Sequence, residues 1–143
     1  MRTLLACSLL ASSLWAGASC SRDSATAERA SARPAGATVS TVSVDQLDRM
    51  LANHACQPVD ANGDTTRKRM GVIPGAVLLR DMDAVDQLPA DKARPLVFYC
   101  ANPACGASHE AAEKAITAGY THVHVLPDGI AGWVKAGKQT ASI

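Results

Sequence analysis

The sequence contains no block of basic residues interleaved with aromatic side chains, which is the pattern typical of nucleic-acid-binding proteins. Aromatic residues make up only 3% of the 143 residues, and the formal net charge is +1. The short basic run Arg67-Lys68-Arg69 is predicted to form a solvated face. We therefore expect no nucleic acid among the partners.

A hydrophobic run long enough to cross a membrane is also missing, since a spanning helix needs about 20 apolar residues. Arg2 followed by the apolar segment from Leu4 to Trp15 and then by small residues indicates a signal peptide over residues 1–19. The chain is therefore predicted to be exported to the cell envelope, facing the periplasm.

Two processing sites are consistent with this signal. Residues 16–18 (Ala-Gly-Ala) fit cleavage after Ala18, whereas residues 17–20 (Gly-Ala-Ser-Cys) resemble a bacterial lipoprotein box with Cys20 as the lipidated residue. We favour the lipoprotein, because a cysteine just past a signal core precedes a stretch rich in Ser, Ala, Arg and Pro. The chain would then touch the membrane only through its lipid anchor.

Large apolar side chains are nearly absent from residues 20–37, so this segment is predicted to be a disordered tether. About 100 residues remain, over 38–143, which is enough for one compact core. Without residues 1–19 the chain has 13 basic and 13 acidic residues, and its net charge is near zero. We expect a monomer.

Strand and helix patterns alternate along residues 38–143. Ser43 and Gln46 form a capping-box pattern at the start of the first helix. Strands are predicted over residues 57–60, 77–79, 96–99 and 122–126, and helices over 44–54, 81–88, 108–118 and 129–136. This alternation predicts an α/β fold with a parallel sheet and helices on both faces.

Cys100 follows the apolar run at residues 96–99, and the predicted helix after it begins at Ser108, which is a suitable N-cap. In parallel α/β sheets, ligands bind outside the carboxyl ends of the strands. The positive end of a helix and its unpaired N–H groups stabilise a thiolate, which is the reactive form of cysteine. This placement suits a nucleophilic or sulfur-carrying Cys100.

Five short segments support a more specific interpretation. They are residues 59–60 (Val-Asp), 71–76 (Gly-Val-Ile-Pro-Gly-Ala), 97–100 (Val-Phe-Tyr-Cys), 119–126 and 129–137 (Gly-Ile-Ala-Gly-Trp-Val-Lys-Ala-Gly). In this order they resemble the single-domain rhodanese-like, or sulfurtransferase, family. Val72 stands where the family has a histidine. The resemblance implies a three-layer α/β/α fold over residues 38–143.

The resemblance also implies sulfurtransferase chemistry. Cys100 would take sulfane sulfur as a persulfide from a small donor or a protein persulfide, and pass it to a thiol or cyanide-like acceptor. We expect no cofactor. His122 and His124 alternate on one predicted strand without a third ligand, so no metal is expected either.

Two departures from the family pattern remove positive charge. Residues 101–107 contain no Lys or Arg, and Ala61-Asn62 follow Asp60 where the family usually has Val-Arg. We therefore expect weak handling of a dianion such as thiosulfate, and a neutral or protein-bound persulfide as the donor. Related phosphatases use Cys-x5-Arg, but Gly106 occupies the arginine position, so phosphatase activity is not expected.

The other site residues have two interpretations each. Cys105 is either a resolving thiol that attacks a Cys100 persulfide or a structural cysteine. His109 either assists the thiolate or is solvated, and Asp60 is expected to order the neighbouring loop rather than to act as a base. Cys56 is predicted to be a small buried hydrophobe. Backbone N–H groups of the active-site loop would cradle the sulfur; its residues are Ala101, Asn102, Pro103, Ala104, Gly106, Ala107 and Ser108.

Two other functions stay open. The first is a thiol–disulfide redox protein that uses Cys100 and Cys105, although the spacing is not the Cys-x-x-Cys of thioredoxin-like proteins. The second is a catalytically silent rhodanese-like binding module.

Overall fold

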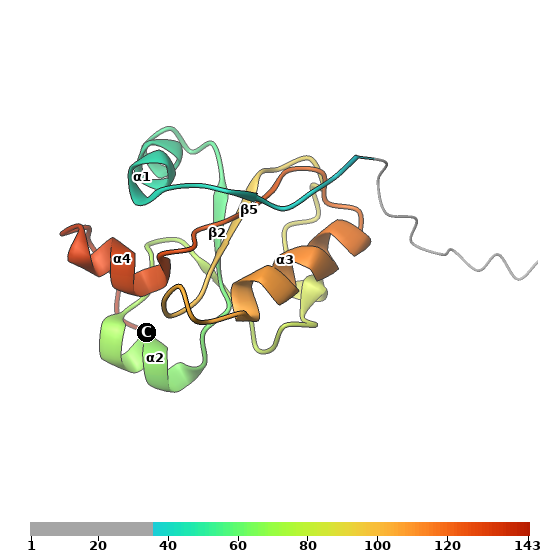
Figure 1. Ribbon diagram of the computed structural model, residues 1–143. Helices are drawn as coiled ribbons and strands as arrows, with labels where there is room; N and C mark the ends of the chain where they lie inside the picture. The colour runs from blue at the N-terminus through green and yellow to red at the C-terminus, as the bar shows by residue number, and fades with distance from the viewer. Residues whose placement is uncertain (1–35) are drawn as a thin grey trace, which may run out of the picture.

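Figure 1 shows the computed structural model of the protein, which describes residues 36–143. The predicted signal peptide, Cys20 and all of the predicted tether except residues 36 and 37 lie outside the described residues. Over residues 36–143, no helix combines the length and the apolar character needed to cross a membrane.

Five parallel strands form one sheet in the order β1-β5-β4-β2-β3. The central strand β4 pairs with β2 in a register that places Tyr99 opposite Asp60. The chain steps outward from β2 to β3 and then returns to β4 and β5, so the strand order reverses between β2 and β4. Ligands bind at such switch points in α/β sheets. The strands are β1 (Ser40–Thr41), β2 (Gln57–Asp60), β3 (Val77–Leu78), β4 (Leu96–Tyr99) and β5 (Val123–Val125).

Helices cover both faces of the sheet, as predicted. Helices α1 (Val44–Ala52), α2 (Asp64–Met70) and α4 (Gly129–Lys135) lie on one face, and α3 (Ala107–Thr117) lies on the other with a short 3-10 helix, η1 (Val85–Gln87) (Figure 1). This arrangement confirms the three-layer α/β fold. The capping box at α1 is present: Ser43 accepts from the Gln46 N–H, and the Gln46 side chain accepts from the Ser43 N–H.

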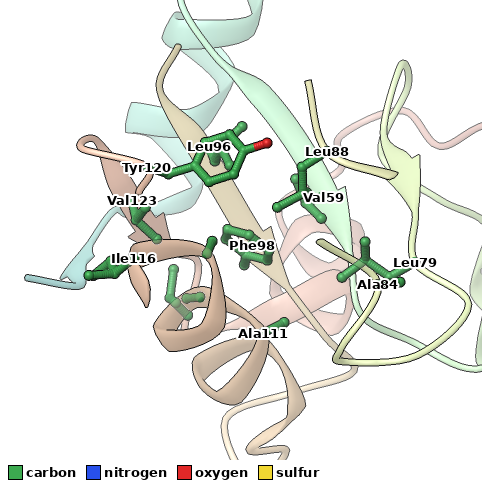
Figure 2. Packing of buried hydrophobic residues seen from close by; sticks show 13 residues of the cluster. Val59, Leu79, Ala84, Leu88, Leu96, Phe98, Ala111, Ile116, Tyr120 and Val123 are labelled. Atoms are coloured by element: carbon green, nitrogen blue, oxygen red, sulfur yellow. The ribbon is translucent and has the colours of Figure 1, made fainter. Parts of the chain in front are cut away.

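The central strand divides the core into two clusters, because successive side chains of a strand point to opposite faces. Leu96 and Phe98 pack toward α3, whereas Val97 and Tyr99 pack toward α1 and α4, and all four are completely buried. Figure 2 shows Phe98 facing α3, from which Ala111 projects toward the sheet. Burial on both faces explains why this strand is an uninterrupted apolar run in the sequence.

Several boundaries differ from the prediction. The helix predicted over 81–88 is reduced to the 3-10 turn η1, and helix α2 was not predicted. The sequence of α2 gives a weak local signal, because it contains two adjacent threonines and its N-cap, Gly63, has no capping side chain. Tertiary contacts of Arg67 therefore stabilise this helix more than its own propensity does.

Candidate active site around Cys100

Cys100 lies at the carboxyl end of β4, beneath the loop that leads to α3, with only 2% of its surface exposed. Asn102 folds this loop: its Oδ1 accepts from the Ala104 N–H at 2.9 Å, and its backbone carbonyl accepts from the Cys105 N–H at 3.0 Å. These turns bring the carbonyl oxygen of Cys105 to 3.0 Å from the Cys100 sulfur. The sequence predicts that N–H groups of this loop cradle the sulfur. Those of Ala104 and Cys105 do not, because they donate to Asn102 inside the loop.

Ser108 supplies the donors that reach Cys100. Its Oγ donates to the Cys100 Sγ at 3.3 Å, and its backbone N–H also hydrogen-bonds to that sulfur. The prediction that Ser108 is the N-cap is wrong, because α3 begins at Ala107 and Gly106 precedes it without a side-chain cap. Ser108 is instead the second residue of the helix, is 2% exposed, and directs its hydroxyl at the sulfur.

The pKa values of the two thiols of the site are shifted in opposite directions. Burial, and then a hydrogen bond to Cys105, raise the pKa of Cys100, and the two donors of Ser108 offset this only in part. Burial acts on Cys105 in the same direction, but hydrogen bonds from the Cys100 thiol and from the Ala101 and Ala107 N–H groups lower its pKa overall. The helix start therefore does not lower the pKa of Cys100 overall, because burial and the hydrogen bond to Cys105 outweigh the two donors of Ser108.

Helix α4 holds the start of the loop from behind. The Ile130 N–H donates to the Cys100 carbonyl at 2.8 Å, and the Ala131 N–H donates to the Ala101 carbonyl at 3.0 Å. Gly129 has φ +59°, and a Cβ added there would lie 2.5 Å from the Cys100 carbonyl oxygen. Only glycine allows this close approach of α4 to the backbone of the active-site loop.

The model of the rhodanese-like domain family matches residues 43–136 of the chain. The chain belongs to this family. Among curated proteins, a sequence comparison finds no match.

Solved structures of rhodanese-like proteins show the same fold. The Alr3790 protein from Anabaena sp. is 26% identical with a TM-score of 0.63, over 71% of this chain and 82% of that one. A rhodanese-like domain protein from Staphylococcus aureus is 27% identical with a TM-score of 0.57, over 72% and 99%. The human single-domain sulfurtransferase TSTD1 is 21% identical with a TM-score of 0.57, over 66% and 95%, and shows likeness of fold alone.

Next to Cys100, the rhodanese-like domain has a buried charge pair at the end of β2. Asp60 is completely buried, and its Oδ1 accepts from the Asn62 N–H at 2.6 Å and from the Arg67 Nε at 3.4 Å. The Nη2 of Arg67 donates to the carbonyls of Asp60 (3.1 Å) and Leu79 (2.7 Å). The prediction that Asp60 orders the neighbouring loop is confirmed.

The same pair corrects the prediction for the basic run. Arg67 is only 6% exposed, whereas Lys68 and Arg69 are exposed. The sequence signal that identifies Arg67 is the strand-ending Asp60, because a buried carboxylate needs a cation nearby. Asn62, which stands where the family usually has arginine, is 7% exposed, and its Nδ2 has no hydrogen-bond partner. This domain therefore has a neutral amide at that family position.

The remaining candidates lie apart from the sulfur. His109 is exposed on the first turn of α3, which agrees with the solvated interpretation. His124 hydrogen-bonds Ser40 and His122 lies against the Ala93 carbonyl. Among residues 36–143 there is no group of three or more His, Cys, Asp or Glu side chains placed to hold a metal ion.

Cys56 is a third free thiol, 4% exposed, and burial raises its pKa to about 11, while the charge of Arg94 opposes the shift. It is a small buried hydrophobe, as predicted. A cleft of about 680 Å³ borders it, with Gln57 and Pro58 among the lining residues. Since these residues begin β2, this cleft lies at the amino edge of the sheet, away from Cys100.

Proposed function

We propose that this rhodanese-like domain is a sulfurtransferase that holds sulfane sulfur as a persulfide on Cys100 and passes it to a thiol or cyanide-like acceptor. The observation that carries the proposal is the position of the Cys100 sulfur, at the strand-order reversal and under the first turn of α3, with both donors of Ser108 directed at it. Membership of the rhodanese-like family supports the same chemistry.

In the loading step, the Cys100 thiolate attacks the sulfane sulfur of a persulfide donor. A sulfur–sulfur bond forms at Cys100, the donor's sulfur–sulfur bond breaks, and the donor's remaining sulfur leaves as a thiolate that can take up the proton lost by Cys100. In the transfer step, the acceptor attacks the outer sulfur and Cys100 leaves as thiolate. The Ser108 hydroxyl and N–H stabilise the charge on Cys100 in both steps.

We propose a neutral or protein-bound persulfide as the donor in preference to thiosulfate. Residues 101–107 contain no Lys or Arg, and the neighbouring Arg67 is engaged with Asp60 and two carbonyls. A dianion at this loop would therefore meet neutral donors only, which are weaker than charged ones.

We also propose that the protein is an exported monomer held at a membrane through lipid on Cys20. The apolar segment over residues 4–15 and the cysteine that follows it support this. Expression of the full chain in bacteria should give a membrane-bound protein, and Cys20→Ser should give a protein released by osmotic shock. Membrane association that persists in Cys20→Ser would contradict the lipid anchor.

The activity is tested with the full-length chain, a persulfide donor and cyanide as acceptor, with thiocyanate as the product measured. Cys100→Ser should abolish transfer, whereas Cys56→Ser should retain it, because Cys56 is an equally buried thiol outside the site. Retained transfer in Cys100→Ser would refute the proposal. A reduced wild-type chain that neither gains sulfur nor makes thiocyanate would favour the silent binding module.

A further inference from the structure

The active-site loop contains a second thiol, Cys105, whose backbone carbonyl contacts the Cys100 sulfur. The turn built on Asn102 returns the chain to Cys100, so the Cys105 carbonyl lies 3.0 Å from the Cys100 sulfur, and each thiol shifts the pKa of the other. Cys100 is 2% exposed, whereas Cys105 is only partly buried. Both thiols are free. Any sulfur added to Cys100 would therefore be bound next to a reduced thiol.

The hydrogen bonds of the loop divide between the two sulfur atoms. The donors at Cys100 are the hydroxyl and N–H of Ser108, and the donors at Cys105 are the N–H groups of Ala101 and Ala107. The second pair comes from the loop start and the helix start, which are the groups expected to hold the outer sulfur of a persulfide. In this domain the Cys105 sulfur already occupies them, which favours an attacking thiolate at residue 105.

We propose that Cys105 resolves the Cys100 persulfide, releasing sulfide and leaving a Cys100–Cys105 disulfide. This inference rests on the proposed function. The Cys105 thiolate attacks the inner sulfur, the one bound to the Cys100 Cβ, and the bond between the inner and outer sulfur atoms breaks. The outer sulfur leaves as hydrosulfide with the electron pair of that bond. The sulfane sulfur is reduced to sulfide, and the two cysteines are oxidised to a disulfide.

Attack on the inner sulfur follows from the contacts. The Cys100 Sγ, which becomes the inner sulfur after loading, is the atom that lies against residue 105, at 3.0 Å from its carbonyl oxygen. The disulfide must then be reduced by an external dithiol, through thiol–disulfide exchange. The partner class is therefore a dithiol protein, and the substrate class is a persulfide whose sulfane sulfur is reduced to sulfide.

The test uses one loading of the full-length chain without oxygen. The chain is reduced with a dithiol, the dithiol is removed, and equimolar glutathione persulfide is added. The wild type should release an equimolar amount of sulfide, and its mass should fall by two hydrogens, mapped to a peptide that joins Cys100 to Cys105. Cys105→Ser should keep one extra sulfur on Cys100 and release about tenfold less sulfide or less.

A second readout separates this inference from the proposed function. With cyanide present, Cys105→Ser and Cys105→Ala should both yield more thiocyanate per loading than the wild type, because the persulfide no longer decays. Cys56→Ser is the matched control and should behave as the wild type does.

Three results would overturn the inference. If the wild type keeps its extra sulfur and releases no sulfide, Cys105 is not a resolving thiol and the sulfurtransferase proposal stands. If Cys100→Ser gains sulfur on Cys105, the two roles are reversed. If no variant gains sulfur, releases sulfide or makes thiocyanate, the proposed function itself fails.

Discussion

Two loops leave the carboxyl edge of the sheet from neighbouring strands, and they differ in how they use charge. The loop after β2 is flanked by a completely buried carboxylate, Asp60 at the end of β2, and by a nearly buried guanidinium, Arg67 of α2, which also donates to the Leu79 carbonyl. The loop after β4 contains two cysteines and neutral donors from Ser108 and the backbone. The buried cation thus lies beyond the end of β2, whereas the two sulfur atoms lie beyond the end of β4.

The first of these regions stabilises the edge of the sheet, whereas the second contains the two free thiols. The charge pair holds the ends of β2 and β3 in place, since Arg67 hydrogen-bonds to both. The loop after β4 is held through backbone hydrogen bonds from α4. Its two sulfur atoms are contacted by neutral donors, from Ser108 at Cys100 and from the backbone at Cys105. Because Arg67 is engaged with Asp60 and two backbone carbonyls, the hydrogen-bond donors at the Cys100 sulfur are neutral groups.

The largest effect is expected from removing the buried cation beside the first loop, Arg67 of α2. Arg67→Met leaves Asp60 buried without its partner and should lower the free energy of unfolding by about 3–5 kcal/mol. Urea unfolding of both proteins measures this. Lys68→Met, at the exposed neighbouring position, should change it by no more than about 0.5 kcal/mol. Equal effects of the two substitutions would show that the buried pair does not stabilise the edge.

Placing a cation in the second loop makes the two loops more alike. Gly106 has φ −83°, and a Cβ added there has no atom within 4 Å, so Gly106→Arg is tolerated by the fold. One charged hydrogen bond to thiosulfate is worth about 1.5 kcal/mol, so kcat/KM for thiosulfate should rise about tenfold. The rise should shrink at high ionic strength. Gly106→Gln is the control, and an equal rise there would contradict an electrostatic cause.

Removing a neutral donor from the second loop should have a smaller effect. Ser108→Ala deletes one hydrogen bond to the Cys100 sulfur, worth about 1 kcal/mol, and raises the pKa of Cys100 further. Alkylation of Cys100 at neutral pH should be about fivefold slower in Ser108→Ala than in the wild type. The two rates should become equal at a pH above the pKa of Cys100 in both proteins. Ser43→Ala, at the α1 cap, should leave the pH profile unchanged. An unaltered profile in Ser108→Ala would mean that the hydroxyl does not stabilise the thiolate.

The smallest effect concerns the two thiols of the second loop. The pKa of Cys105 lies below its ordinary value and that of Cys100 above it, so iodoacetamide should modify Cys105 first at neutral pH. The lead should narrow as the pH rises, since Cys100 then ionises as well. Peptide mapping over time measures both rates. Faster labelling of Cys100 would show that the resting thiolate is on Cys100.

The sequence predicted the features that depend on local pattern. The apolar run before Cys100 identified the central strand, since both of its faces are buried, and Asp60 was correctly expected to order its loop. Arg67 was missed because its burial depends on the ends of β2 and β3 meeting in space, which a run of three basic residues does not indicate. The burial of Arg67 is determined by contacts between segments far apart in the sequence, whereas the strand at residues 96–99 is indicated by its own apolar run.

The hydrogen bonds around Cys100 depend on the position at which helix α3 begins and on the fold of the loop before it. Helix α3 begins one residue before the predicted start, and this converts Ser108 from a cap into a donor to Cys100. The raised pKa of Cys100 follows first from its burial and then from the neighbouring Cys105 side chain, and the turn around Asn102 brings residue 105 back to the Cys100 sulfur. Neither the helix register nor the loop fold is determined by spacing alone.

The contact between α4 and the active-site loop also sets an order of events during synthesis. The donors to the Cys100 and Ala101 carbonyls belong to Ile130 and Ala131, which the ribosome adds after the loop itself. Until that last helix has emerged and docked, the loop lacks its anchor, and Cys100 is a cysteine in an unfinished domain. A chain truncated before α4 would therefore lack both of these hydrogen bonds to the loop that contains Cys100.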